Sequence, residues 1–205
     1  MHARLTRFEG SPDQVEAGTK LIQETVIPAA RKLQGFKGGV WMIDRTSGKG
    51  FGLTVFENEA AVRATEDAAA QIRSAASETT KITGVERYEV VAEATPRSDS
   101  AAARVTNFEG SPEQADALIT FTKETVVPGA KALEGFAGGY WLLDRANGKG
   151  VAVTLFESAE ARQASEAFAA QTRTDATELT SAKMTGVERY EVVAQAVPEA
   201  AATRG

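Results

Sequence analysis

Polar and apolar residues alternate near the start of the chain, in LTRFE at positions 5–9, and this predicts a half-buried β-strand. Ser11 followed by Pro12 then indicates the start of a helix. The apolar stripe expected of that helix consists of Val15, Leu21, Ile22, Val26 and Leu33. Pro28 lies inside the stripe and should kink or interrupt the helix, because proline lacks an N–H and clashes with the preceding turn. Gly35 is expected to end it.

Two further runs, GGVWMID at 38–44 and FGLTVFE at 51–57, favour strands, and the short polar segment between them predicts a hairpin. An alanine-rich helix should follow and reach roughly Thr80. The alternating run ITGVERYEVVAEA at 82–94 predicts a last strand. The order β-α-β-β-α-β is that of a ferredoxin-like unit.

The whole pattern occurs twice. GFKGGVWMIDRTSGKG at 35–50 returns as GFAGGYWLLDRANGKG at 135–150, and about half of positions 4–80 match 104–180. A period near one hundred is too long for a solenoid repeat and indicates a duplicated domain. The expected divisions are a first repeat over 1–94, a linker over 95–103, a second repeat over 104–198 and a flexible tail over 199–205.

The run PAARKLQGFKGG at 28–39, the hairpin, and then FENEAAVRA at 56–64 resemble the antibiotic biosynthesis monooxygenase-like family of the dimeric α/β-barrel superfamily. The resemblance extends through both repeats. It implies an α+β fold in which two ferredoxin-like βαββαβ repeats pair sheet to sheet. Because this chain carries both repeats, we expect an intramolecular pseudo-dimeric α/β barrel. The function implied is binding of a small apolar or aromatic molecule, with cofactor-independent oxygenation of a polycyclic phenol or anthrone as the reaction.

The resemblance also points to site positions. Relatives carry a tryptophan in a W-E-S-type motif at the end of the third strand, where this chain has Phe56 and Phe156. They carry an asparagine on the first strand, which matches Asn107, while Arg7 stands at that position in the first repeat. Asn107 would then hydrogen-bond a ligand carbonyl or phenolate. The alternative is a surface or barrel-facing polar residue that drifted between the copies.

Haem is a further implication, because haem-degrading relatives place a histidine near the positions of Glu66 and Glu166. Carboxylates are poor replacements for a neutral imidazole on haem iron. His2 is the only histidine and is expected at a mobile terminus. The chain has no cysteine, so thiolate metal sites are excluded. We therefore expect no cofactor and no metal.

Aromatic residues on the strands are the remaining candidates. Trp41 and Trp141 lie mid-strand and belong either to the core or to a pocket for a flat ligand. Tyr88 and Tyr190 lie on the last strands, beside arginines that point to the opposite face; tyrosine and arginine together could polarise a phenol or stabilise an enolate. The alternative for Arg87 is a charged ladder with carboxylates of the same parity. Those carboxylates are Glu9, Glu57 and Glu89.

The residues predicted to form the site fall into two groups. The catalytic candidates are Asn107, Arg189 and Tyr190. The ligand-binding candidates are Trp41, Phe56, Tyr88, Trp141 and Phe156. Substitutions between the copies, such as Ala68 against Phe168, predict that the two halves do not keep identical cavities.

Composition limits the alternatives. The net charge of −5 over 205 residues leaves no basic field for a nucleic-acid partner. No apolar run approaches the roughly 20 residues that span a bilayer, and no signal-peptide stretch opens the chain, so a cytoplasmic protein is expected. Three functions stay open: a monooxygenase-type enzyme, a non-catalytic ligand-binding or structural protein, and an isomerase or lyase. Further self-association of the pseudo-dimer also stays open.

Overall fold

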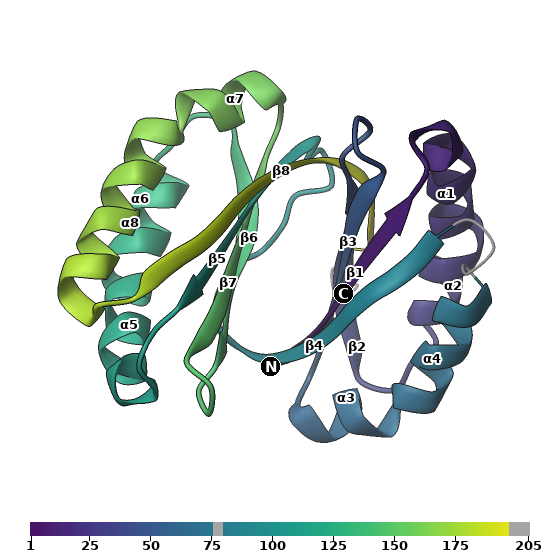
Figure 1. The fold of residues 1–205 in the computed structure, drawn as a ribbon, viewed down its shortest axis with the longest axis horizontal. Coiled ribbons are helices and arrows are strands. Elements are labelled where there is room, and N and C mark those ends of the chain that lie inside the picture. Colours follow the sequence, from purple (N-terminus) through teal and green to yellow (C-terminus); the bar gives the residue numbers. More distant parts are fainter. Residues whose placement is uncertain (76–79, 197–205) are drawn as a thin grey trace, which may run out of the picture.

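The computed structural model describes residues 1–75 and 80–196, and these form one closed antiparallel β-barrel with helices outside it (Figure 1). The strands of the first half are β1 His2–Gly10, β2 Phe36–Ile43, β3 Lys49–Phe56 and β4 Thr80–Ala94. Those of the second half are β5 Ala102–Glu109, β6 Phe136–Asp144, β7 Lys149–Phe156 and β8 Lys183–Ala196. The predicted order of elements and the predicted fold class, two ferredoxin-like repeats in one barrel, are confirmed.

The barrel closes because the last strand of each half pairs with both halves. β4 pairs with β1 of its own half and with β6 of the other, where Ala92 lies opposite Trp141. β8 likewise pairs with β5 and with β2, where Ala194 lies opposite Trp41. The strand order around the barrel is therefore β1-β3-β2-β8-β5-β7-β6-β4. Exposed sheet edges are the usual route by which sheets associate further, and the closed barrel leaves none among its eight strands.

The first long helix of each repeat is interrupted, as its proline predicts. In the first half α1 Val15–Leu21 runs into a π-helical turn, Ile22–Val26, and then into α2 Ile27–Ala30. The turn ends two residues before Pro28, where an ordinary helix would clash with the proline ring. The second half repeats this with α5 Ala115–Phe121, the π-helical turn Thr122–Val126 and α6 Val127–Lys131.

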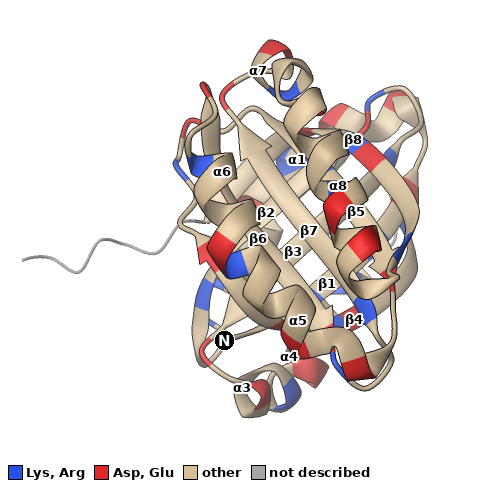
Figure 2. Cartoon of the chain, turned by 90° about the vertical axis from the view of Figure 1, so that its left-hand side faces the viewer, with Lys and Arg blue, Asp and Glu red and all other residues tan. Residues whose placement is uncertain are grey.

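The alanine-rich helix is broken, against the prediction of one continuous helix. It forms α3 Glu59–Ala64 and α4 Glu66–Ala75 in the first half, and α7 Ala159–Ala164 and α8 Glu166–Thr180 in the second. The helices of the second half lie across the outer face of its sheet (Figure 2). None of the helices in the described part of the chain is long and apolar enough to cross a membrane.

Two expectations about the ends of the repeats change. His2 belongs to β1, opposite Phe56 and Glu89, rather than to a mobile terminus. β5 begins at Ala102, so the last two residues of the expected linker are strand. The tail expected over 199–205 lies outside the described residues.

The barrel interior is filled by side chains from both halves. Its core includes Leu5, Met42, Phe51 and Leu53 from the first half and Val105, Leu142, Val153 and Leu155 from the second, each 0–1% exposed. Phe51 packs near Tyr190 of the other half, with 6.3 Å between ring centroids. Space for a ligand must therefore be sought on the outer face of the sheet, beneath the helices.

Because the halves share one core, damage to one should unfold both. Phe51→Ala is expected to lower the free energy of unfolding by about 3–5 kcal/mol, the usual cost of removing a buried phenyl ring. Urea unfolding is followed in Trp41→Phe and Trp141→Phe backgrounds, so that each half reports separately. Both reporters should shift together. A shift confined to Trp41 would contradict a shared core, and Leu179→Ala on the exposed surface should change stability by no more than about 0.5 kcal/mol.

Candidate functional site

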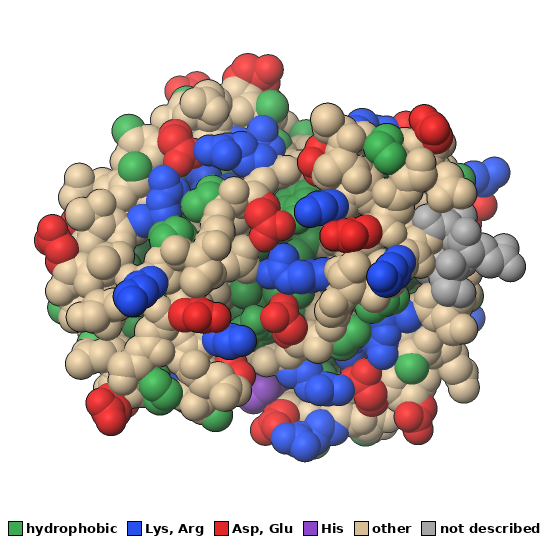
Figure 3. Space-filling view, viewed as in Figure 1, with side chains coloured by type: hydrophobic (Ala, Val, Ile, Leu, Met, Phe, Trp, Pro, Cys, Tyr) green, Lys and Arg blue, Asp and Glu red, His purple; other side chains and the backbone are tan. Residues whose placement is uncertain are grey.

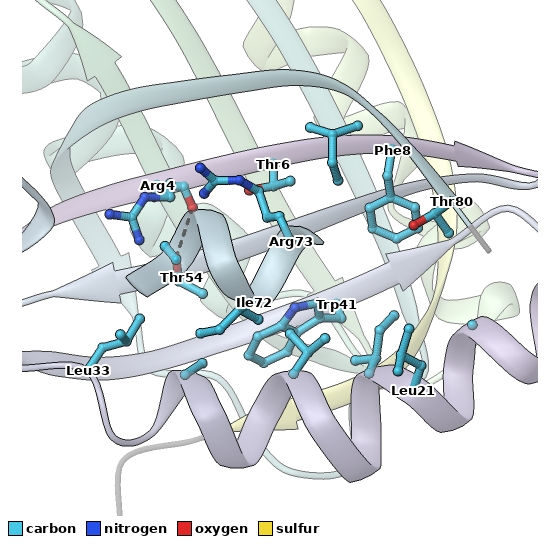
Figure 4. Close-up of a pocket in the computed structure, with 17 residues that line it drawn as sticks. Arg4, Thr6, Phe8, Leu21, Leu33, Trp41, Thr54, Ile72, Arg73 and Thr80 are labelled. Carbon is cyan, nitrogen blue, oxygen red and sulfur yellow. Dashed lines mark hydrogen bonds between the residues drawn. The ribbon is translucent and has the colours of Figure 1, made fainter. Parts of the chain in front are cut away.

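Each half contains a cavity between its helices and the outer face of its sheet. The first has a volume of about 90 Å³ and the second about 110 Å³. A cavity of roughly 150 Å³ lined by apolar side chains is known to hold one benzene molecule. Each cavity is therefore close to the size of a single aromatic ring. The residues that line the first include Phe8, Leu21, Ile22, Val26, Leu33, Trp41 and Ile72 (Figure 4).

A buried indole forms part of the floor of each cavity. Trp41 is 4% exposed and Trp141 is 5% exposed, and both line the cavity of their half. The ring of Trp41 lies over Gly39, where an added Cβ would come within 2.7 Å of Trp41 Cη2. The sequence left two alternatives for these tryptophans, core packing or a pocket wall, and both apply: each indole is buried and lines a cavity. Gly39 of the repeated GG(V/Y)W phrase therefore makes room for the indole of Trp41.

In the first half, a buried arginine joins the cavity to the break between α3 and α4. Arg4 is 2% exposed, and its Nη2 donates to the carbonyl oxygen of Val62 at 2.7 Å and to Thr65 Oγ1 at 3.2 Å. Val62 lies in the last turn of α3, whose carbonyls lack helical partners and attract cations. Arg4 therefore stabilises the point at which the alanine-rich helix ends early.

Glu66, the first residue of α4, draws three arginines together. Arg4, Arg73 and Arg87 approach its carboxylate at 3.3, 2.9 and 2.7 Å. Arg4 and Arg73 lie on the same side of the cavity in Figure 4. Burial opposes ionisation of Glu66, but the hydrogen bonds from Arg87 and Arg73 and the charge of Arg4 outweigh it and lower the pKa to about 2.

The second half repeats this cluster. Glu166 binds Arg104 at 3.1 Å, Arg173 at 2.7 Å and Arg189 at 3.3 Å. Burial raises the pKa of Glu166, and these three cations together bring it below its ordinary value. The predicted ladder of charges across the sheet is therefore wrong, because Arg87 and its counterpart in the second half pair with helix carboxylates.

The residues present do not fit a histidine-ligated haem. At the positions where haem-degrading relatives carry histidine, Glu66 and Glu166 are each held by three arginines. His2 lies on β1, with its Nδ1 buried and unpartnered among the described residues. No group of three or more histidine, aspartate or glutamate side chains within residues 1–75 and 80–196 could hold a metal ion.

The W-E-S-like segments serve the fold. Phe56 and Phe156 are 0% and 1% exposed, and the guanidinium carbons of Arg4 and Arg104 lie 5.2 and 5.4 Å from their ring centroids. Phe156 lines the second cavity. Asn58, the third residue of the first segment, caps α3 by accepting the Ala61 N–H at 2.8 Å.

Asn107, Tyr88 and Tyr190 lie on the other face of the sheet. Asn107 accepts a hydrogen bond from Arg7 Nη2 at 2.6 Å and donates to Glu188 at 2.7 Å. The hydroxyl of Tyr190 also donates to Glu188. Burial raises the pKa of both tyrosines, so they stay protonated near neutral pH. The structure does not bring these residues together with the tryptophans, and one small ligand cannot contact both groups.

Arg189, the remaining catalytic candidate, lies on the helix-covered side with its side chain 46% exposed. The structure thus brings Trp141 and Phe156 together at the second cavity. Arg189 does not line this cavity; it binds Glu166, which also binds the cavity-lining Arg104. The buried arginines were missed from the sequence. The available signal was that arginine recurs at positions 4 and 104, and glutamate at positions 66 and 166.

The two cavities differ through one pair of substitutions. Phe168 lines the second cavity, and its ring occupies space beside Gly129, where an added Cβ would come within 2.5 Å of the ring. The first half has Ala68 and Ala29 at these positions. The second half thus combines a larger residue at 168 with a smaller one at 129, as close packing of the two positions requires.

No protein-family model matches the chain. Two uncharacterised proteins of Mycobacterium tuberculosis are similar in sequence. Rv2557 is 26% identical over 166 residues, which cover 80% of this chain and 74% of the relative. Rv2558 is 26% identical over 198 residues, covering 94% and 83%.

Solved structures identify the class of fold. Two putative monooxygenases, from Lactobacillus acidophilus and Fusobacterium nucleatum, match with TM-scores of 0.69 and 0.72 at 10% and 14% identity. The matches cover 97% and 96% of this chain and 98% and 94% of theirs. An anthrone oxidase-like protein matches with a TM-score of 0.64 at 15% identity, covering 97% of this chain and 94% of its own. The chain therefore has the dimeric α/β-barrel fold, with both ferredoxin-like halves in one polypeptide.

The cluster around Glu66 predicts acid sensitivity. A carboxyl whose pKa falls from 4.5 to about 2 on folding contributes stability above pH 4.5, and this contribution disappears as the pH falls through 2. Glu66→Gln should be less stable at pH 7 and should lack this part of the acid dependence. Urea midpoints between pH 2 and pH 7 measure it, with Asp13→Asn on the exposed surface as the control. An unchanged slope between pH 4.5 and 2 would contradict the role given to Glu66.

The Phe168 substitution predicts a difference in ligand size. Phe168→Ala should widen the second cavity and tighten binding of naphthalene at least about tenfold, since burying further aromatic surface contributes roughly 1.5–3 kcal/mol. Quenching of Trp141 in a Trp41→Phe background measures this. The reciprocal pair, Ala68→Phe with Ala29→Gly, should weaken binding beside Trp41 in a Trp141→Phe background. Equal naphthalene affinity before and after both changes would show that Phe168 does not limit the cavity.

Proposed function

We propose that each half binds a small apolar or aromatic molecule in its cavity, against Trp41 in the first half and Trp141 in the second. The observation that carries the proposal is an apolar cavity, floored by a buried indole and roofed by a π-helical turn, in both halves. Ligand sites are typically concave and apolar with a few polar groups that fix orientation. Phe156 is a further contact in the second half, and the polar groups that line the cavity there include Thr106, Thr154, Arg104 and Arg173.

The size of the cavities limits the ligand. A volume near 100 Å³ accommodates about one ring by comparison with the cavity that holds benzene. A polycyclic phenol or anthrone would need side chains to move, with Phe168 the first in the second half. The proposed ligand is accordingly a one-ring aromatic or a short apolar chain.

Cofactor-independent oxygenation is the catalytic form of this proposal, and the likeness to proteins named as monooxygenases and as anthrone oxidase-like supports it. The reaction would convert a ring CH₂, such as that of the keto tautomer of a one-ring phenol, and O₂ to a ring carbonyl and water, through a substrate anion. Glu166 is a weak base, because the arginines around it lower its pKa. The substrate would therefore have to ionise readily, while Arg104 and Arg173 stabilise its negative charge.

The competing proposal is a binding protein without catalysis. It is supported by the lack of a strong base among the described residues that line the cavities. Asn107 and Tyr190 have no part in either proposal, because they face the barrel interior.

Titration of tryptophan fluorescence with toluene, phenol and indole tests ligand binding. We expect saturable quenching in each single-tryptophan protein, Trp41→Phe and Trp141→Phe, because each indole borders a cavity. Oxygen consumption with any ligand that binds then distinguishes the two proposals: uptake with product formation supports oxygenation, and binding without uptake supports the non-catalytic function. No saturable response in either protein would contradict the proposed pocket. Leu179→Ala serves as the control variant, since its side chain is 52% exposed and lines neither cavity.

A further inference from the structure

Two arginines that line the second cavity each carry a buried donor without an acceptor. Arg104 Nε and Arg173 Nη1 are inaccessible to solvent and make no hydrogen bond within the described part of the chain. Both residues line the cavity, and Arg104 is 3% exposed as a whole. Buried N–H groups of charged side chains are costly to leave unpaired, and they usually have a partner. A ligand carboxylate that reached these two side chains would supply the acceptors that they lack.

The two guanidinium groups are neighbours because they share one carboxylate. Arg104 Nη2 contacts Glu166 Oε2 at 3.1 Å, and Arg173 Nη2 contacts Glu166 Oε1 at 2.7 Å. Arg189 contacts the same carboxylate at 3.3 Å. Three cations thus share a single anion, and the second cavity has an excess of positive charge beside its apolar lining.

The first half has the same cluster of three arginines around one glutamate, but its hydrogen bonds differ. Arg4 Nε donates to Glu66 Oε2 at 3.3 Å, whereas its counterpart Arg104 Nε has no acceptor among the described residues. The second cavity is also the larger of the two. The unpartnered Nε donor is therefore found in the second half and not at the equivalent position of the first.

We infer that the second cavity recognises aromatic carboxylates, with the carboxylate bound by Arg104 and Arg173 and the ring packed against Trp141. A carboxylate offers two oxygens that can each accept one N–H, and guanidinium–carboxylate hydrogen bonds are among the strongest in proteins. The cavity volume suits the ring, and the carboxylate would lie against the two arginines in the cavity wall. This inference rests on the proposed ligand pocket and names the class of ligand that it takes.

Benzoate and benzamide test the inference, because they share size and shape and differ in charge. Binding is measured by calorimetry and by Trp141 quenching in a Trp41→Phe background. Benzoate should bind at least about tenfold more tightly than benzamide, as expected for a charged hydrogen-bond pair. Arg173→Gln should abolish this preference, and Arg173→Lys should retain part of it. Arg63→Gln, which removes an exposed arginine from α3, should leave the preference unchanged.

Each alternative result has a definite meaning. Equal binding of benzoate and benzamide, or an unchanged preference in Arg173→Gln, would overturn the inference and indicate that water satisfies the two donors. Binding of toluene without binding of benzoate would overturn it while leaving the proposed pocket intact. Absence of binding by all three compounds would overturn the pocket as well. The benzoate-to-benzamide ratio in the protein with Arg173 intact decides the matter even where Arg173→Gln fails to fold.

Discussion

The pairing of each last strand with the other half is the constraint on which the rest of the structure depends. β4 and β8 are the longest strands, and each contributes one edge to its own sheet and one to its partner's. Closing the barrel in this way directs the apolar residues of both sheets into a common interior, which the side chains fill. The opposite faces must then be covered by helices, and the two cavities lie where this covering is incomplete. The position of the two cavities is thus a consequence of how the barrel closes.

Because both halves belong to one chain, equivalent positions can carry different residues, and the barrel interior contains such a pair. Arg7 and Asn107 occupy the same repeat position and hydrogen-bond each other across the barrel. Two arginines at that contact would place like charges together. One arginine with one asparagine instead satisfies Glu86 and Glu188 without repulsion. On the face drawn in Figure 3, acidic and basic side chains are likewise interspersed rather than gathered by sign.

The sequence predicts the repeat, the hairpins and the order of elements because these depend on local pattern: alternation, turn residues and proline. It does not predict which strand residues share a pocket. Both faces of this sheet are covered, one by the other half and one by helices. Alternation therefore sorts the strand residues into two faces but does not indicate which face lies under the helices. The sequence pattern therefore places Asn107 and Trp141 in one predicted site, although they lie on opposite faces of the sheet. The arginines around Glu166 come from β5, α8 and β8, and their meeting depends on tertiary packing that no local pattern records.

The buried arginines connect the stability of the fold with the chemistry of the cavity. Arg104 donates to the Arg162 carbonyl oxygen at 2.7 Å and to Ser165 Oγ at 2.9 Å, so it holds the break between α7 and α8. Burial lowers its pKa, which means that the interior disfavours its charge. Glu166 compensates only in part, because it is shared with Arg173 and Arg189. A structural role accounts for the donors of Arg104 that point to the helices, but it leaves Nε without a function. An anion in the cavity would supply the missing counter-charge, and by linkage it would stabilise the folded chain in proportion to its binding.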